Sequence, residues 1–151
     1  MTQTISRYLV ERHSSVGLDH CLEMVIAFQT AFSNPISSNP RKLAADRLST
    51  RVEYLLSEVR ELEAADSIEA QSDALADLIY FALGAFAEMG IKPQRVFEIV
   101  HSANMSKRFP DGSVRHLPIN GKVAKPAEWV GPEDAILEEI KRQTNKSIDR
   151  A

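Results

Sequence analysis

The stretch that decides the fold is residues 73–90, "DALADLIYFALGAFAEMG", in which apolar residues recur at helical spacing on almost every side. Fourteen residues separate Asp73 from Glu88, and Asp77 is the only carboxylate among them. An unpaired charge inside such a helix would cost several kcal/mol of folding free energy. The sequence therefore predicts that Asp77 is paired with a cation, protonated or bound to a metal ion.

The neighbouring segments have helical patterns as well, so the sequence predicts an all-α fold, a bundle of four or five helices. Pro, Gly, Asn and Ser mark where these helices begin and end, and Ser67 and Gly90 are expected to cap the helix formed by the stretch quoted above. The helices expected are 18–32, 42–65, 68–89, 93–107 and one that begins at 131–134. Residues 109–131 are rich in Gly and Pro and indicate a loop or a small hairpin.

The bulk composition is that of a single globular domain. The chain has 151 residues, 44% of them hydrophobic and 26% charged, so we expect one all-α domain over residues 18–151 after an N-terminal extension, residues 1–17. The net charge of −3 argues against a nucleic-acid partner. We also expect a cytoplasmic protein without a membrane partner, because the N-terminus has no signal-peptide pattern and the run 74–87 is too short to cross a bilayer. The single cysteine, Cys21, is expected in the core.

Four carboxylates are predicted to lie close together. Glu58 and Glu61 follow Arg51 and Tyr54 on a polar stripe of the helix 42–65, while Asp73 and Asp77 share one side of the next helix. The connection between these helices is short, so they should pack antiparallel, with Glu61 level with Asp73 and Glu58 level with Asp77. Four carboxylates at one place need cations, and Mg²⁺ prefers such oxygen ligands.

Two alternatives to this metal site remain open. The glutamates could be ordinary surface residues, and Asp77 could form a buried ion pair with Arg51 or Lys107. A different kind of metal site, a di-iron centre, would use Glu98 and His101, an E-x-x-H pair, but this chain has one copy and both residues lie off the apolar face.

A basic segment follows the predicted carboxylate helices. Residues 107–125 contain five Lys or Arg residues against one acid, Asp111, which indicates either a local anion site or a solvated loop. Asn104 and Lys107 continue the inner face of the helix 93–107 at its end, and Lys122 and Lys125 lie further along. Lysines near a metal-binding carboxylate cluster would fit a substrate that carries phosphates.

These motifs resemble a known family. "EVRE" (58–61), "DALADLIYFALG" (73–84), "HSANMSK" (101–107) and "INGKVAKPAEW" (119–129) occur in the order found in the MazG-like all-α nucleoside triphosphate pyrophosphohydrolases, above all the phosphoribosyl-ATP pyrophosphohydrolase-like branch. The chain departs from the family pattern at Ser57 and at Ala74, where many members have acids.

The resemblance implies a reaction and a set of residue roles. The reaction is Mg²⁺-dependent hydrolysis (Mn²⁺ is an alternative) of a nucleoside triphosphate to a monophosphate and pyrophosphate, a reaction suited to clearing nucleotide pools. Glu58, Glu61 and Asp77 would be catalytic, and together with Asp73 they would hold the metal. The substrate would contact Asn104, Lys107, Lys122 and Lys125. A homodimer or homotetramer is expected, while the base and sugar stay open. The alternatives are a Mg²⁺-nucleotide-binding module without activity, a di-iron protein and a purely structural helical protein.

Overall fold

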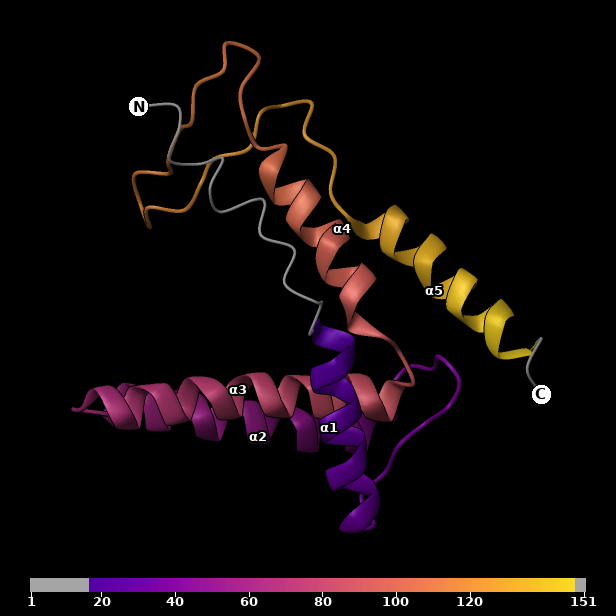
Figure 1. Cartoon of the computed structure of the whole chain (residues 1–151). Coiled ribbons are helices and arrows are strands. Elements are labelled where there is room, and N and C mark those ends of the chain that lie inside the picture. Colours follow the sequence, from indigo (N-terminus) through magenta and orange to yellow (C-terminus); the bar gives the residue numbers. More distant parts are fainter. Residues whose placement is uncertain (1–16, 149–151) are drawn as a thin grey trace.

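The computed structural model describes residues 17–148, and this part of the chain folds into five helices joined by irregular connections (Figure 1). The helices are α1 (Leu18–Ala31), α2 (Ala45–Ala64), α3 (Ile68–Met89), α4 (Pro93–Met105) and α5 (Glu133–Ile148). The predicted all-α fold is confirmed, and each predicted helix is found within a few residues of its expected bounds. The predicted N-terminal extension lies almost entirely outside the described residues.

The ends of α3 form as the sequence predicts. Ser67 is its N-cap, and the hydroxyl oxygen of Ser67 accepts a hydrogen bond from the backbone N–H of Ala70 at 3.1 Å. Gly90 ends the helix in the left-handed region, with φ of 68°. A Cβ atom at Gly90 would also lie 2.4 Å from the carbonyl oxygen of Asn39, so both the backbone conformation and the close approach require glycine there.

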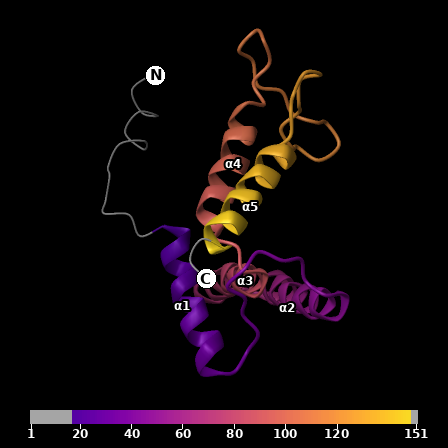
Figure 2. The same cartoon turned by 90° about the vertical axis from the view of Figure 1, so that its right-hand side faces the viewer.

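The helices are arranged in two groups. α2 and α3 run side by side and antiparallel, and α1 crosses over the C-terminal half of α3 (Figures 1 and 2). The chain bends by 117° between α3 and α4, and α5 lies alongside α4. The long connection between α4 and α5 therefore lies at the end of α4 that is remote from α3. Its one antiparallel bridge, between His116 and Val123, agrees with the predicted loop or small hairpin.

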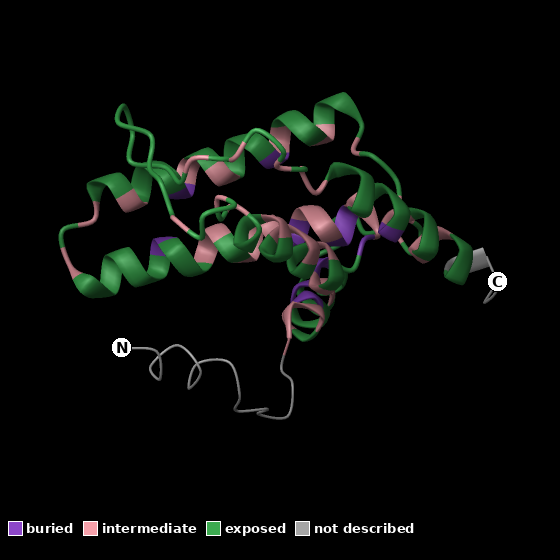
Figure 3. Cartoon of the chain, turned by 90° about the horizontal axis from the view of Figure 1, so that it is seen from above, coloured by how far each residue is buried: buried purple, intermediate pink, exposed green. Residues whose placement is uncertain are grey.

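The core lies where α1 crosses α3 (Figure 3). Leu22 and Val25 of α1 pack against Leu83 and Ala87 of α3, and Cys21 packs against this cluster, as predicted. Burial of these apolar side chains fixes the position of α1 on α3.

The packing faces of α2 and α3 differ from the sequence prediction. By helical spacing in the sequence, Val59 of α2 and Ile79 of α3 belong to apolar faces that are expected to pack inward, yet Val59 is 47% exposed and Ile79 is 57% exposed. Two members of the polar stripe of α2, Arg51 and Glu58, are buried instead, and Gly84 on α3 leaves room for the side chain of Arg51. A helical pattern shows which side of a helix is apolar, but it does not show which neighbour covers that side.

Gly84 on α3 lies against two buried polar side chains. A Cβ atom there would lie 2.8 Å from Nη1 of Arg51 and 3.0 Å from Oε1 of Gln29. The Arg51 guanidinium is held in place by hydrogen bonds from its Nε and Nη2 atoms, the latter to this Gln29 oxygen. We expect Gly84→Ala to lower the free energy of unfolding by about 1–3 kcal/mol through overpacking. Urea denaturation measures this loss, with Ala85→Ser at the neighbouring half-buried position as a control of small effect. Stability at the native level in Gly84→Ala would contradict this packing.

No single helix of the described residues is long and apolar enough to cross a membrane. α3 and α4 taken together are long and apolar enough, but they form a pair bent by 117°.

Candidate functional site

The register between α2 and α3 is set by contacts at the C-terminal half of α3. The ring of Tyr54 on α2 lies 5.3 Å from the ring of Phe81 on α3, centroid to centroid. Glu58 follows Tyr54 by four residues on α2, and Asp77 precedes Phe81 by four residues on α3. Because the two helices are antiparallel, Glu58 and Asp77 therefore lie at the same level. A further turn brings Glu61 to the level of Asp73. The four predicted carboxylates are thus distributed along one pair of helices, at the levels expected from the short connection.

Glu58 is the unusual member of this set. Its side chain is buried, with 6% of the residue exposed, and its Oε2 atom is the one buried side-chain oxygen or nitrogen of residues 17–148 that lacks a hydrogen-bond partner. Its other oxygen, Oε1, lies 3.2 Å from the hydroxyl of Ser57, which also contacts the carbonyl oxygen of Tyr54 at 2.7 Å. A buried carboxylate oxygen without a donor is costly, so this atom marks a place where a cation or a ligand group would be stabilised.

The other three carboxylates are less enclosed. Asp77 is half-buried, while Glu61 and Asp73 are exposed. Within residues 17–148, no group of three or more His, Cys, Asp or Glu side chains is arranged so that it could hold a metal ion. Ala74, where the resemblance would imply an acid, is buried. The four-carboxylate metal site therefore stays a prediction, and Glu58 with Asp77 forms its most enclosed part.

The alternative ion pairs of Asp77 are not found. Arg51 is bonded to other partners: its Nε atom donates to Oε2 of Glu88 at 2.8 Å, and its Nη2 atom donates to Oε1 of Gln29 at 2.8 Å. Lys107 donates instead to Oδ1 of Asn104 at 2.6 Å. Among residues 17–148, no side chain forms a hydrogen bond or an ion pair with the Asp77 carboxylate, which leaves it available to a bound group.

Glu88, which the sequence analysis did not assign to any contact, is the centre of a buried ionic network. Two nitrogens of Arg47, Nε and Nη2, donate to Glu88 at 2.6 and 3.1 Å, in addition to the bond from Arg51. Burial raises the pKa of Glu88, but the hydrogen bonds from both arginines outweigh that effect and hold the pKa below its usual value of 4.5. Because every oxygen of Glu88 is satisfied, we assign this network to the packing of α1, α2 and α3 rather than to ligand binding.

Two of the three predicted substrate-binding lysines lie beside the ring of Trp129. The Nζ atoms of Lys125 and Lys107 lie 4.0 and 5.6 Å from the centroid of the Trp129 ring, while Lys122 is exposed. The indole Nε1–H of Trp129 donates to the carbonyl oxygen of Ala103 at 2.8 Å, which fastens the α4–α5 connection to the end of α4. Trp129 is therefore an anchor for two lysines.

The anchoring role of Trp129 is testable. Trp129→Phe keeps an aromatic ring but removes the hydrogen bond to Ala103, so we expect a loss of about 1 kcal/mol of unfolding free energy. Hydrogen exchange of the amides in the α4–α5 connection should speed up at the same time. Lys125→Gln, at an exposed position, should change both quantities much less. Equal effects of the two substitutions would contradict the anchoring role.

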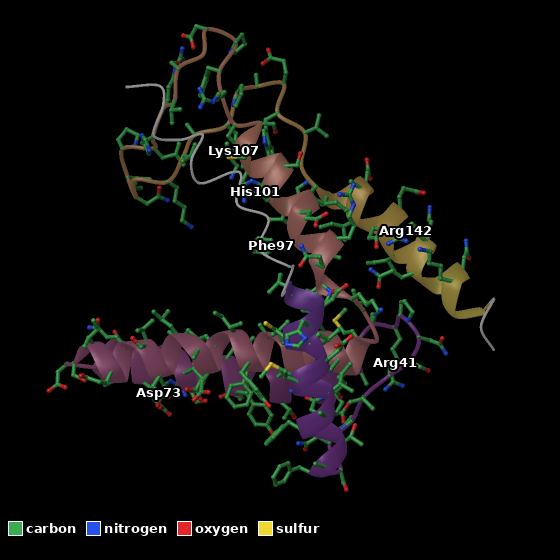
Figure 4. The ribbon with its side chains drawn as sticks, in the orientation of Figure 1. Arg41, Asp73, Phe97, His101, Lys107 and Arg142 are labelled. Carbon is green, nitrogen blue, oxygen red and sulfur yellow. The ribbon has the colours of Figure 1, made fainter. Side chains whose placement is uncertain are left out.

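The two halves of the predicted site lie apart within one chain. Figure 4 shows Asp73 on the α2–α3 pair and Lys107 at the far end of α4, beyond the bend that follows α3. The carboxylates and the lysines therefore do not form one cluster in the single chain. The sequence could not reveal this separation, because it depends on the angle between α3 and α4.

The predicted surface position of the E-x-x-H pair is confirmed. Glu98 and His101 are both exposed, and Glu98 accepts hydrogen bonds from Arg95 and Gln94, each at 2.9 Å. A glutamate held in this way by two donors on its own helix is not oriented toward a di-iron centre.

A match to a family model agrees with the resemblance seen in the motifs. The family model described as phosphoribosyl-ATP pyrophosphohydrolase matches residues 25–104, which include Glu58, Asp77 and Asn104. No curated protein matches the chain. A solved structure of a candidate NTP pyrophosphohydrolase from Exiguobacterium sp. 255-15 is 25% identical, with a TM-score of 0.47, and the match covers 83% of this chain and 96% of that one.

Proposed function

The chain belongs to the phosphoribosyl-ATP pyrophosphohydrolase family and is thus a hydrolase of the nucleotide pyrophosphohydrolase type, and from this premise we propose its reaction. The proposed substrate is a nucleoside triphosphate, which water cleaves between the α- and β-phosphates to give a monophosphate and pyrophosphate. Removal of unwanted nucleotides from the pool is the role that this reaction would serve.

The observation that carries the proposal is the unpartnered Oε2 atom of Glu58, at the level of Asp77 on the opposite helix. A carboxylate pair of this kind offers the oxygen ligands that Mg²⁺ or Mn²⁺ accepts. Glu61 and Asp73 lie one turn further along and are exposed, so their side chains are free to turn toward the same ion. A divalent ion bound there would supply the positive charge that offsets the charge of the phosphate chain.

The chain's own groups would then have separate tasks. A carboxylate of the stripe, Glu58 or Glu61, would accept the proton of the attacking water. Lys107, Lys122 and Lys125 would contact phosphate oxygens and stabilise the charge that develops on them, because lysine donates to phosphate as a compact cation. Asn104 would contact the sugar or the base while its Oδ1 atom orients Lys107.

A second copy of the chain would complete this arrangement. In one chain the lysines lie away from the carboxylates, and the outer faces of α2 and α3 expose apolar side chains. Those side chains are Leu48, Val52, Leu56 and Val59 of α2 and Leu75 and Ile79 of α3. Two antiparallel helices with an uncovered apolar face can form a four-helix bundle with a copy of themselves. We therefore propose a homodimer or homotetramer in which lysines of one copy approach carboxylates of another. Light scattering after size-exclusion chromatography would measure the mass of the assembly. The mass of a monomer would contradict this arrangement.

A product assay tests the reaction. The purified protein is incubated with Mg²⁺ and a panel of ribo- and deoxynucleoside triphosphates together with phosphoribosyl-ATP, and pyrophosphate and phosphate are measured separately. Release of pyrophosphate with an equal amount of monophosphate is the expected result, and the panel names the substrate. Release of phosphate alone would contradict the proposal. Saturable Mg²⁺-nucleotide binding without any product would favour the non-catalytic module, for which the replacement of acids by Ser57 and Ala74 is the supporting observation.

A further inference from the structure

A cavity of about 480 Å³ lies at the other end of α3 from Asp73, where α5 approaches the α3–α4 connection. Its walls come from the start of α1, residues 38–40, the connection after Gly90, the start of α4, and α5. A volume of this size suits a small organic ligand. None of the carboxylates or lysines of the proposed active site lines it, so it is a separate site.

The cavity is rich in positive charge, although the whole chain is acidic. Four cationic side chains line it, against two carboxylates, and they come from the α3–α4 connection, α4 and α5. These cations are Lys92, Arg95, Arg142 and Lys146. Cations that converge from separate elements on one concave surface concentrate positive potential there, which favours an anionic ligand.

Both carboxylates of the cavity already have partners. Glu139 is buried, with 6% exposed, and accepts hydrogen bonds from Nε and Nη2 of Arg142 at 2.6 and 2.5 Å and from Gln143 at 2.8 Å. Asp19 accepts a hydrogen bond from the backbone N–H of Gln94 at 3.0 Å. Neither carboxylate contacts Lys92 or Lys146, whose ammonium groups form no hydrogen bond or ion pair within residues 17–148. Two cations thus remain available to a ligand.

The framework around these cations is fixed by Gln143. Its Oε1 atom accepts a hydrogen bond from the backbone N–H of Lys92 at 2.9 Å, and its Nε2 atom donates to the carbonyl oxygen of the same residue at 3.1 Å. α5 is therefore attached to the α3–α4 connection at the edge of the cavity. Arg142 is oriented in turn by Glu139, so the cationic wall formed by α5 is pre-organised.

We propose that this cavity binds a small phosphorylated molecule, whose phosphate oxygens contact Lys92, Lys146 and the remaining N–H donors of Arg142. Lysine and arginine are the side chains that most often bind phosphate, and a ligand between them would join α5 to the α3–α4 connection. The ligand would therefore stabilise the position of α5 on the rest of the molecule.

Isothermal titration calorimetry tests this site with inorganic pyrophosphate and, separately, with AMP, both in EDTA so that no divalent ion occupies the carboxylate site. The variant is Lys92→Gln/Lys146→Gln. Because both lysines are exposed, the fold should persist, and circular dichroism checks this. The matched control is Lys141→Gln, an exposed lysine of α5 that pairs with Glu138 and does not line the cavity.

We expect saturable binding of pyrophosphate or AMP to the native protein, a Kd at least about tenfold higher in the double variant, and a native Kd in the control. Binding of pyrophosphate alone would identify a free phosphate-type ligand, while tighter binding of AMP would identify a nucleotide. Absence of saturable binding of both probes, or an equal Kd in the double variant, would overturn the proposal. Hydrolysis at the carboxylate site is measured by a different assay, so the two proposals can fail independently.

Discussion

Glu58→Gln is expected to lower the rate of pyrophosphate release by at least about 100-fold while the protein stays folded. The substitution keeps the size and shape of the side chain but removes the negative charge from the buried Oε2 atom. This charge is needed to bind a metal ion or to accept a proton. It is not needed for the fold, because no donor among the described residues forms a hydrogen bond with this atom. The free energy of unfolding should therefore stay within about 1 kcal/mol of the native value.

The matched control for this prediction is Glu53→Gln, an exposed glutamate on the same helix. Its activity and stability should both equal those of the native protein. If Glu58→Gln kept the native rate, Glu58 would be a structural residue and the carboxylate stripe would not be the active site. If it unfolded the protein, the carboxylate would have a structural partner that the structure does not show.

Glu88→Ala should have the largest effect on stability, a loss of about 3–5 kcal/mol of unfolding free energy. The substitution removes the acceptor for Arg47 and Arg51 and leaves the guanidinium of Arg51, whose side chain is 7% exposed, without a compensating charge. Urea denaturation at neutral pH measures the loss. Glu98→Ala removes an exposed ion pair with Arg95 and should have little effect. A small effect of Glu88→Ala would mean that the network does not hold the three helices together.

The same network predicts how stability depends on pH. The pKa of Glu88 in the folded protein lies below 4.5, because the hydrogen bonds from the two arginines outweigh the effect of burial. A lowered folded pKa means that the ionised carboxylate contributes stability above pH 4.5, and that this contribution is lost as the pH falls through the folded pKa. Native stability should therefore fall more steeply below pH 4.5 than that of Glu88→Ala. Parallel pH profiles of the two proteins would contradict the assignment.

The sequence predicts the helices and the register of α2 and α3 well, because these depend on local signals. Ser67 and Gly90 cap α3 as predicted. The short connection before Ser67 favours antiparallel packing of α2 and α3. That pairing alone places Glu58 at the level of Asp77.

The packing faces could not be predicted in the same way. Val59 and Ile79 look like core residues in a helical pattern, yet they are exposed in the single chain, while Arg51 and Glu88 are buried. An arginine or a glutamate taken alone fits a surface position as well as a buried one. Burial becomes favourable only when a residue of opposite charge lies across the helix pair. A search for opposite charges at matching levels of α2 and α3 would have found Arg47 with Glu88, and Arg51 lies one turn further along α2. The distance between Lys107 and the carboxylates depends on the bend after α3, for which the sequence has no comparable signal.

The most direct test of the account compares the native protein with Asp77→Ala in the assay that measures pyrophosphate and phosphate separately. Asp77 is half-buried on α3 at the level of Glu58, and neither of the cations considered as its partners contacts it. We expect Mg²⁺-dependent pyrophosphate release by the native protein and none above background by the variant. Asp66→Ala, which changes an exposed aspartate in the α2–α3 connection, should be as active as the native protein. A native rate in Asp77→Ala would contradict the assignment of catalysis to these carboxylates.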